Sequence, residues 1–283
     1  MIKIYYKPLS TILIIWFALV CCETVTAADG KLLATPGVSQ IEGAAGGGIV
    51  PWAQLAGYAS EDEIAANVFC SRGKVDDYQL DVCGAQANLF DRLELSFAKQ
   101  TFKVDALNTD IEQEVFGAKL RLYGDLVYSD WPQISLGVQS KFLKDDSIAK
   151  LVGATDGDGT DWYVSASRLK LAAISGYNWL WNVTLRHTNA NQIGLLGYST
   201  NHSDTSYFLE ASTAVLLNPS WAVGVEYRQK PNYLNLGEED WKDIFVAWFP
   251  NKSFSLTAAY LDLGSIVGAK GQKGFYLSVT GYW

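Results

Sequence analysis

The stretch Gln272-Lys-Gly-Phe-Tyr-Leu-Ser-Val-Thr-Gly-Tyr-Trp283 ends the chain with alternating apolar and polar residues. In a β-strand, successive side chains point to opposite faces. One face would carry Phe275, Leu277, Val279, Gly281 and Trp283, and the other Tyr276, Ser278, Thr280 and Tyr282. Such a strand needs an apolar solvent on one side and water or polar groups on the other. A transmembrane β-barrel provides both, but a soluble sandwich can also end this way, so the upstream chain has to decide.

Composition narrows the choice of protein class. The 283 residues carry a net charge of −8, and 13% of them are aromatic. A mean hydropathy of +0.04 is too polar for a helical membrane protein. The acidic balance and the lack of a basic block argue against nucleic acid as a partner.

The N-terminus has the pattern of a secretory signal peptide over residues 1–28. Lys3 and Lys7 precede an apolar core at residues 9–20, and cleavage is expected just before Ala28 or Asp29. The core is too short for a membrane-spanning helix, and no later stretch approaches eighteen consecutive apolar residues. A lipoprotein site at Cys21-Cys22 fits poorly, because the residue before the lipidated cysteine would be Val20 or Cys21. The chain is therefore expected to be exported.

Residues 29–48 are rich in Gly and Ala and predict at most one strand, within 31–42. From residue 49 onward, about thirteen segments have the alternation and length of tilted membrane strands. They are Ile49–Tyr58, Glu63–Arg72, Tyr78–Phe90, Arg92–Phe102, Val115–Gly124, Pro132–Leu143, Asp161–Leu171, Trp179–His187, Ser206–Leu217, Trp221–Gln229, Asp243–Pro250, Phe254–Leu263 and Gly274–Trp283.

The connections between these segments alternate between short and long, as in outer-membrane barrels with short periplasmic turns and long external loops. Both chain ends lie in the periplasm only if the strand count is even. One more strand within 31–42 gives fourteen, which is the preferred count. If Ile49–Tyr58 and the opening stay out of the wall, the count is twelve. Residues 49–283 are thus predicted to form one antiparallel up-and-down barrel of the bacterial outer membrane.

The polar faces of the predicted strands define the residues expected to line the lumen. In residues 134–142, for example, Ser135, Gly137, Gln139 and Lys141 oppose an apolar face. Two interpretations of the charged members remain open: a polar pathway whose field selects a solute, or a structural network of ion pairs. The charged candidates are Glu94, Lys119, Arg121, Lys141, Arg186, Glu210, Glu226 and Arg228.

Cys70 and Cys83 lie on consecutive predicted strands, and the turn between them is midway. A tight hairpin places them opposite one another, and the exported compartment is oxidising, so a disulfide is predicted. The alternative is two free thiols on the lipid face. A zinc site is not expected, because no histidine is nearby in the sequence.

No catalytic, metal or cofactor site is predicted, and the protein is not expected to be an enzyme. The run Asp156-Gly-Asp-Gly-Thr-Asp161 resembles a calcium loop, but Thr160 and Ser167 stand where carboxylates are required, so a polar external loop is favoured. His187 is followed by Thr188 and Asn189, so the His–Ser pair of a lipid hydrolase is missing.

Several stretches of the chain form recognisable motifs: Gly30–Gly48 followed by Pro51-Trp52, Phe90-Asp-Arg-Leu-Glu-Leu-Ser96, Asn189-Ala-Asn-Gln-Ile-Gly194, Val225-Glu-Tyr-Arg-Gln-Lys-Pro231 and Ala258-Ala-Tyr-Leu-Asp-Leu-Gly264. Together they resemble those of a proteobacterial family of exported β-barrel proteins, the domain-of-unknown-function family 3034. This resemblance covers essentially the whole mature chain. It implies an outer-membrane barrel without an assigned substrate or catalytic residues, and Cys70 and Cys83 are not part of its pattern.

The function expected from these patterns is passive passage of a small solute. The rival is a closed structural or adhesive barrel that acts through its external loops. An open column of water in the lumen would indicate the first, and a tight lattice of paired charges the second. Expected partners are the lipid bilayer, the barrel-assembly machinery through the C-terminal strand, and a small solute.

Overall fold

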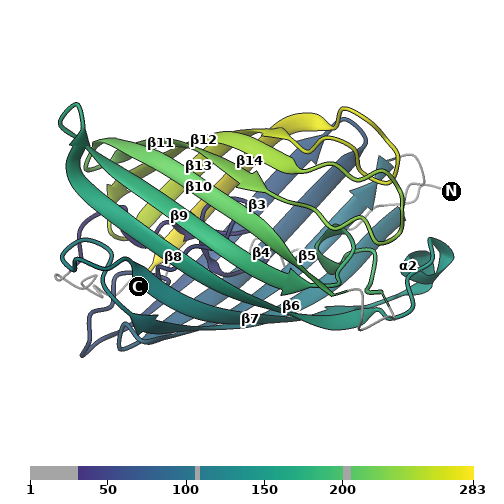
Figure 1. Cartoon of the computed structure of the whole chain (residues 1–283), viewed down its shortest axis with the longest axis horizontal. Helices are drawn as coiled ribbons and strands as arrows, with labels where there is room; N and C mark the ends of the chain where they lie inside the picture. Colours follow the sequence, from purple (N-terminus) through teal and green to yellow (C-terminus); the bar gives the residue numbers. More distant parts are fainter. Residues whose placement is uncertain (1–30, 106–108, 200–204) are drawn as a thin grey trace, which may run out of the picture.

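Twelve strands of the described chain close into one antiparallel barrel (Figure 1). The computed structural model describes residues 31–105, 109–199 and 205–283, so the predicted signal peptide lies outside the described residues. Each strand pairs with its neighbours in sequence, and β14 pairs with β3 to close the wall. The strands are β3 (Ile64–Val75), β4 (Tyr78–Leu89), β5 (Leu93–Val104), β6 (Thr109–Tyr123), β7 (Gln133–Leu143), β8 (Asp158–Ile174), β9 (Tyr177–Thr188), β10 (Ser206–Asn218), β11 (Trp221–Arg228), β12 (Trp241–Asn251), β13 (Phe254–Asp262) and β14 (Lys273–Tyr282).

The alternation of side chains sorts each strand into a lumen face and an outer face. In β14, Tyr276 and Ser278 are buried, whereas Phe275 and Leu277 are 71% and 51% exposed on the outside, as the terminal stretch predicted. Tyr123, at the end of β6, departs from this alternation. A register shift follows Arg121, and the side chain of Tyr123 is exposed on the outside. A closed wall satisfies the strand hydrogen bonds internally, which lets an apolar outer face lie in lipid.

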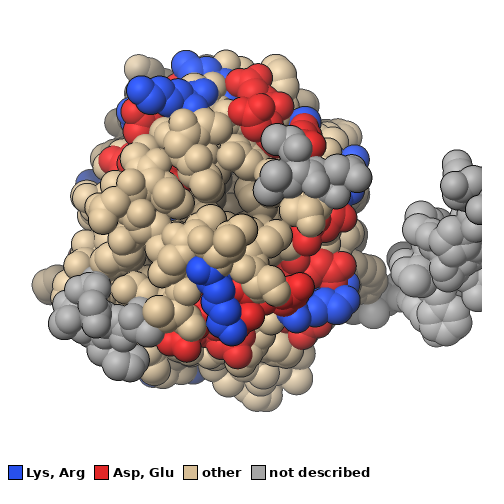
Figure 2. Space-filling model, turned by 90° about the vertical axis from the view of Figure 1, so that its right-hand side faces the viewer, with Lys and Arg blue, Asp and Glu red and all other residues tan. Residues whose placement is uncertain are grey.

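The two ends of the barrel differ in their loops. The long connections at residues 144–157, 189–199, 229–240 and 263–272 lie at one end, together with helix α2 (Ser147–Leu151), on the right of Figure 1. We call it the outer end and the opposite one the periplasmic end. Figure 2 looks onto the outer end, where charged side chains surround an uncharged centre. No helix among the described residues is long and apolar enough to span a membrane.

The preferred count of fourteen strands is wrong, and the alternative of twelve is confirmed. The two surplus segments, within 31–42 and at 49–58, lie inside the lumen, where almost every residue from 35 to 59 is buried. They lack one exposed and one buried face, so they cannot form wall. The only strands that the structure describes between residues 31 and 63 are the two-residue β1 (Val38–Ser39) and β2 (Ala45–Gly46), which pair with each other.

The wall therefore begins at Ile64, and the expected barrel boundary at residue 49 falls inside the barrel. The alternation of short and long connections still holds, because removing two predicted strands leaves an even number of wall strands. We call residues 31–63 the plug; its purple ribbon is visible behind the front strands in Figure 1.

Candidate functional site: the plugged lumen

The plug has little secondary structure, so wall side chains must satisfy its backbone groups. Lys119 Nζ donates to the carbonyl oxygens of Ala45 and Gln54, both at 2.8 Å. Glu94 accepts from the N–H groups of Ala45 at 3.1 Å and Ala56 at 2.8 Å. Lys119 and Glu94 also pair with each other at 3.2 Å, and both are 1% exposed. These two predicted lumen residues thus hold the plug from β5 and β6.

Strands β7 and β9 hold the next part of the plug through neutral side chains. The Pro51 carbonyl accepts from Thr184 Oγ1 at 2.7 Å and from Asn182 Nδ2 at 3.3 Å. The Ala53 carbonyl accepts from Ser135 Oγ and Gln133 Nε2, both at 2.6 Å. Pro51 cannot continue a ladder in any case, since it has no N–H to donate. This part of the plug therefore depends on the wall for its conformation.

Glu226 of β11 binds the plug where it approaches the wall most closely. Its Oε2 accepts from the N–H of Ile49 at 2.8 Å, and its Oε1 accepts from Ser212 Oγ at 2.6 Å. A Cβ on Gly47 would lie 1.8 Å from Glu226 Oε1, so a larger residue there would displace this carboxylate. Trp52 Nε1 donates to Ser212 at 2.8 Å, so this tryptophan lies inside the lumen.

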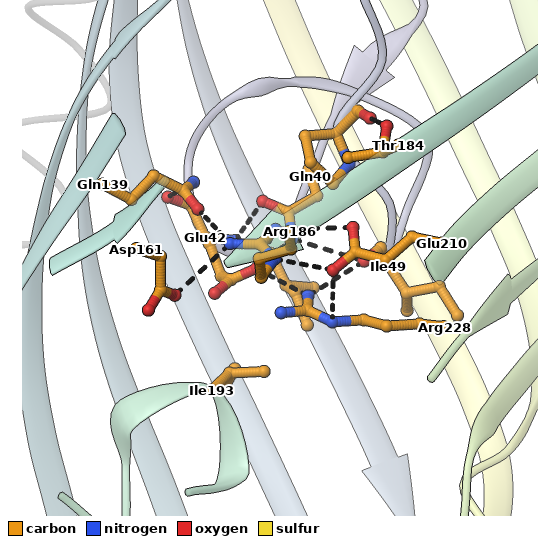
Figure 3. Close-up of polar contacts among 12 residues, drawn as sticks. Gln40, Glu42, Ile49, Gln139, Asp161, Thr184, Arg186, Ile193, Glu210 and Arg228 are labelled. Atoms are coloured by element: carbon orange, nitrogen blue, oxygen red, sulfur yellow. Dashed lines mark hydrogen bonds and ion pairs between the residues drawn. The ribbon is translucent and has the colours of Figure 1, made fainter. Parts of the chain in front are cut away.

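Glu42 of the plug lies among three cations in the outer half of the lumen. Figure 3 shows it beside two of them, Arg186 and Arg228. It pairs with Lys141, with Arg186 at 3.3 Å and with Arg228 at 2.5 Å. Glu42 and Lys141 are 0% exposed. One carboxylate thereby joins the plug to β7, β9 and β11.

Two wall carboxylates complete the charge balance of this cluster. Asp161 pairs with Lys141 at 2.6 Å, and Glu210 pairs with Arg186 at 2.6 Å and with Arg228 at 3.3 Å. Three cations thus meet three carboxylates in a buried, neutral network. Buried ion pairs of this kind are costly to break, because removing one member leaves an uncompensated charge. This arrangement corresponds to the second of the two interpretations of the predicted lumen charges, a structural network of ion pairs.

Arg121, the remaining predicted residue, lies at the periplasmic end, where it pairs with Asp91 and with Asp125 at 3.1 Å. Sequence reasoning missed Glu42 and left Asp161 out of the lumen charges, although it made Asp161 the first residue of a predicted strand; Asp161 belongs to β8 and faces the lumen. One signal was available: the predicted lumen held five basic and three acidic residues, so carboxylates were missing from it. The aperiodic plug offered no pattern that could place Glu42.

The plug's side-chain hydrogen bonds are distributed unevenly around the wall. Strands β4 to β11 supply most of them, and β14 supplies one, from the Tyr282 hydroxyl to the Gly37 carbonyl at 3.3 Å. Within the described part of the chain, no side chain of β3, β12 or β13 hydrogen-bonds the plug, and β12 contacts it through Phe245, whose ring lies 6.5 Å from that of Trp52. Along the same side, Asn67 Oδ1 and Thr257 Oγ1 are buried without a hydrogen-bond partner among the described residues, and the Asp243 carboxyl faces that of Glu226. Buried groups like these are normally satisfied, by protein or by water.

The loop between β9 and β10 closes the lumen from the outer end. Its residues 190–198 are buried, and we call 189–198 the cap. Ile193 has a φ of 57°, which is unusual for a β-branched residue. Its carbonyl accepts from Lys141 Nζ at 2.9 Å, so the same ammonium group holds both the cap and Glu42. A small apolar cavity of about 50 Å³ remains between cap, plug and wall, lined by Ile41 and Ile193 among others.

Cys70 and Cys83 face each other across β3 and β4 and form a disulfide, with Cα atoms 4.1 Å apart. Both side chains are exposed on the outer face of the wall. The disulfide therefore lies away from the plug and the lumen.

A model of a protein family, described as protein of unknown function (DUF3034), matches residues 35–280. No curated protein matches the sequence. Solved structures of similar shape include the outer membrane protein Omp33 of Acinetobacter baumannii, with 7% identity over 79% of this chain and 99% of that one, and a TM-score of 0.48. The porin NanC has 12% identity over 77% and 99% of the two chains, with a TM-score of 0.48. The COG4313 outer membrane channel of Pseudomonas putida F1 has 11% identity over 77% and 94%, with a TM-score of 0.40.

None of these likenesses assigns a solute to the chain. The closed wall and its apolar outer face belong to the one kind of β-structure that can cross a bilayer, because no strand edge is left unpaired in lipid. The protein is a β-barrel of the bacterial outer membrane, and lipid surrounds its wall.

Proposed function

The chain belongs to the family of unknown function DUF3034, and on that premise we propose that it is a passive channel for a small solute, held closed by its own plug. The observation that carries the proposal is the uneven polar anchoring of the plug. A segment that only filled a structural barrel would gain from hydrogen bonds to every part of the wall. Among the described residues, β3, β12 and β13 form no side-chain hydrogen bond with the plug, and the intervening β14 forms one, from Tyr282 to the Gly37 carbonyl.

The solute route of this proposal runs between the plug and the β3, β12 and β13 wall. A shift of the plug there breaks one side-chain hydrogen bond, from Tyr282 of the intervening β14 to the Gly37 carbonyl. The hydroxyl of Thr257, which has no partner among the described residues, and the carboxyl of Asp243 would then line a polar path, since such groups are satisfied by water. The plug stays attached to the opposite wall through Glu42 and Lys119. Opening would thus be a local rearrangement rather than loss of the plug from the lumen.

The second candidate is a permanently closed barrel with a structural or adhesive role. The neutral network around Glu42 favours it, because three cations and three carboxylates leave no charge to guide a solute. An enzymatic role is not part of either proposal. We further propose that assembly uses the C-terminal strand β14 as the segment that the barrel-assembly machinery binds.

The first test is planar-bilayer conductance of wild type beside Glu42→Gln. The variant removes the charge that attaches the plug to Lys141, Arg186 and Arg228. We expect a mostly closed wild type and a severalfold higher open probability in Glu42→Gln. Glu239→Gln, in the exposed loop between β11 and β12, is the matched control and should behave as wild type.

Heat-modifiable migration on gels reports whether each variant is folded. A folded Glu42→Gln protein that stays as silent as the control would contradict the channel and support the closed barrel.

A further inference from the structure

Two carboxyl groups face each other inside the lumen, where β11 and β12 lie side by side. Glu226 of β11 and Asp243 of β12 are directly opposite in the strand register, and their carboxyl groups are within hydrogen-bonding reach of each other. Glu226 is 3% exposed and Asp243 is 7% exposed. Like charges directly opposite in a sheet destabilise it, and burial strengthens their repulsion. The pair therefore needs a cation or a proton to compensate it.

No cation of the described chain forms an ion pair with either carboxyl. Arg228, the next lumen-facing residue of β11, is engaged by Glu42 and Glu210 instead. From β14, Tyr276 faces the pair, but its hydroxyl donates to Ser71 at 3.1 Å. The other neighbours of the pair are uncharged: Ser212 of β10, Trp52 of the plug and Leu261 of β13. A proton shared by the two carboxyls is the compensation that remains.

Hydrogen-bond donors are directed at one carboxyl of the pair. Glu226 accepts from the N–H of Ile49 at 2.8 Å and from Ser212 Oγ at 2.6 Å. It also accepts from Trp52 Nε1 at 3.3 Å. No donor from another described residue bonds either oxygen of Asp243. Donors favour the charged form of the carboxylate that accepts from them, so the proton lies on Asp243 and Glu226 keeps the charge that binds the plug.

The plug lies directly against this pair. A Cβ on Gly48 would be 3.5 Å from Glu226 Oε2 and 3.7 Å from Asp243 Oδ2, which is ordinary van der Waals contact. A second negative charge here would need water around it, because a buried carboxylate without a partner is costly. Water can reach so deeply buried a pair only if the plug withdraws from β12. Among the described residues, β12 forms no side-chain hydrogen bond with the plug that would oppose this movement.

We propose that the proton shared by Glu226 and Asp243 is a pH-sensitive switch on the plug. While the pair holds the proton, the plug stays seated against β12. When alkaline conditions remove the proton, two negative charges face each other, water enters, and the plug withdraws. This inference rests on the proposed function, since withdrawal from β12 would open the solute route. The channel should therefore open as the pH rises and close again when the pH is lowered.

Hydrogen–deuterium exchange of the plug, measured by mass spectrometry on the full mature chain in nanodiscs, tests the switch without requiring conductance. After correction for the intrinsic pH dependence of exchange, we expect residues 45–56 to exchange severalfold faster at pH 10 than at pH 6. Asp243→Asn should abolish this increase, because Asn cannot ionise and its amide can still donate to Glu226.

Asp262→Asn is the matched control. Asp262 of β13 lies one position away from the partner of Asp243 in the strand register, but it pairs with Lys273 at 3.0 Å on the outer face. Its exchange should rise with pH as in wild type. The pKa of Lys230, lowered by burial to about 8, also falls in this pH range. Asp243→Asn retains Lys230, so the difference between wild type and this variant isolates the carboxyl pair.

A wild-type plug whose exchange does not rise with pH, or an equal rise in folded Asp243→Asn, would overturn the proposal. Heat-modifiable migration reports folding, and Asp243→Ser, which also cannot ionise, replaces the variant if the Asn side chain prevents folding. Planar-bilayer recordings of the same proteins separate the switch from the channel. Exchange that depends on pH without conductance at any pH would refute the channel and leave the switch, whereas conductance with exchange that does not depend on pH would refute only the switch.

Discussion

Single buried charges join segments that are far apart in the sequence. Lys141 holds the plug through Glu42 and the cap through the Ile193 carbonyl. Lys230 has a similar role at the outer end, where it pairs with Glu238. A Glu238 oxygen also accepts from the N–H of Val267 at 2.9 Å, which joins the loops after β11 and β13. The alternation of apolar and polar residues in the sequence could place Lys141 in the lumen, because this alternation fixes which face of a strand a residue occupies. The sequence pattern could not identify the partners of Lys141, because Glu42 and Ile193 belong to the aperiodic plug and cap.

Lys230 gives the fold a specific pH dependence. Burial lowers its pKa to about 8, with Glu238 opposing the shift, whereas its ordinary value is 10.5. Between these values the unfolded chain holds the proton and the folded chain does not. Stability should therefore rise with pH across this window, by about 1.4 kcal/mol per pH unit.

Lys230→Met removes that titration. The free energy of unfolding of wild type minus that of the variant should be flat below pH 8 and grow from pH 8 to about 10.5. Urea unfolding from lipid vesicles at pH 7, 8.5 and 10 measures it. A difference that does not change with pH would contradict the assigned burial of this lysine.

At the level of elements, periodicity predicted the wall well and the plug poorly. A wall strand has lipid on one face and the lumen on the other, so its sequence must alternate, as β7 and β14 do. The plug is buried on all sides, and its conformation is imposed by side chains from distant strands, such as Lys119 and Thr184. Its apolar segment at 49–58 therefore looked like a strand without being one.

The Cys70–Cys83 disulfide should affect stability and leave the lumen alone. It joins residues 13 positions apart on the outer face of paired strands. In the chain-entropy model, a cross-link of this span stabilises by about 3 kcal/mol.

Reduction should accordingly lower the free energy of unfolding by roughly 2–3 kcal/mol and leave the conductance unchanged. Thiol labelling before and after reduction is the control, with reactive cysteines expected only afterwards. Equal labelling in both samples would show that the bond is not formed in the protein.

The whole molecule is a closed barrel of twelve strands that is filled by its own N-terminal segment. The cap and the Glu42 network lie toward the outer end. Composition, loop parity and alternation together identified an outer-membrane barrel. Lumen occupancy decides between channel and closed barrel, and it depends on contacts between residues as distant as Glu42 and Arg228, which no local pattern encodes.

The most direct measurement is the single-channel conductance of a truncated mature chain that begins at Ser60, compared with the full mature chain. Truncation removes nearly all of the plug and leaves the wall from Ile64 onward intact. Heat-modifiable migration and reconstitution at equal protein amounts serve as controls for folding. The account predicts large, steady conductance from the truncated barrel and mostly closed traces from the full chain. A folded truncated barrel that stays silent would contradict the claim that the plug is what closes this protein.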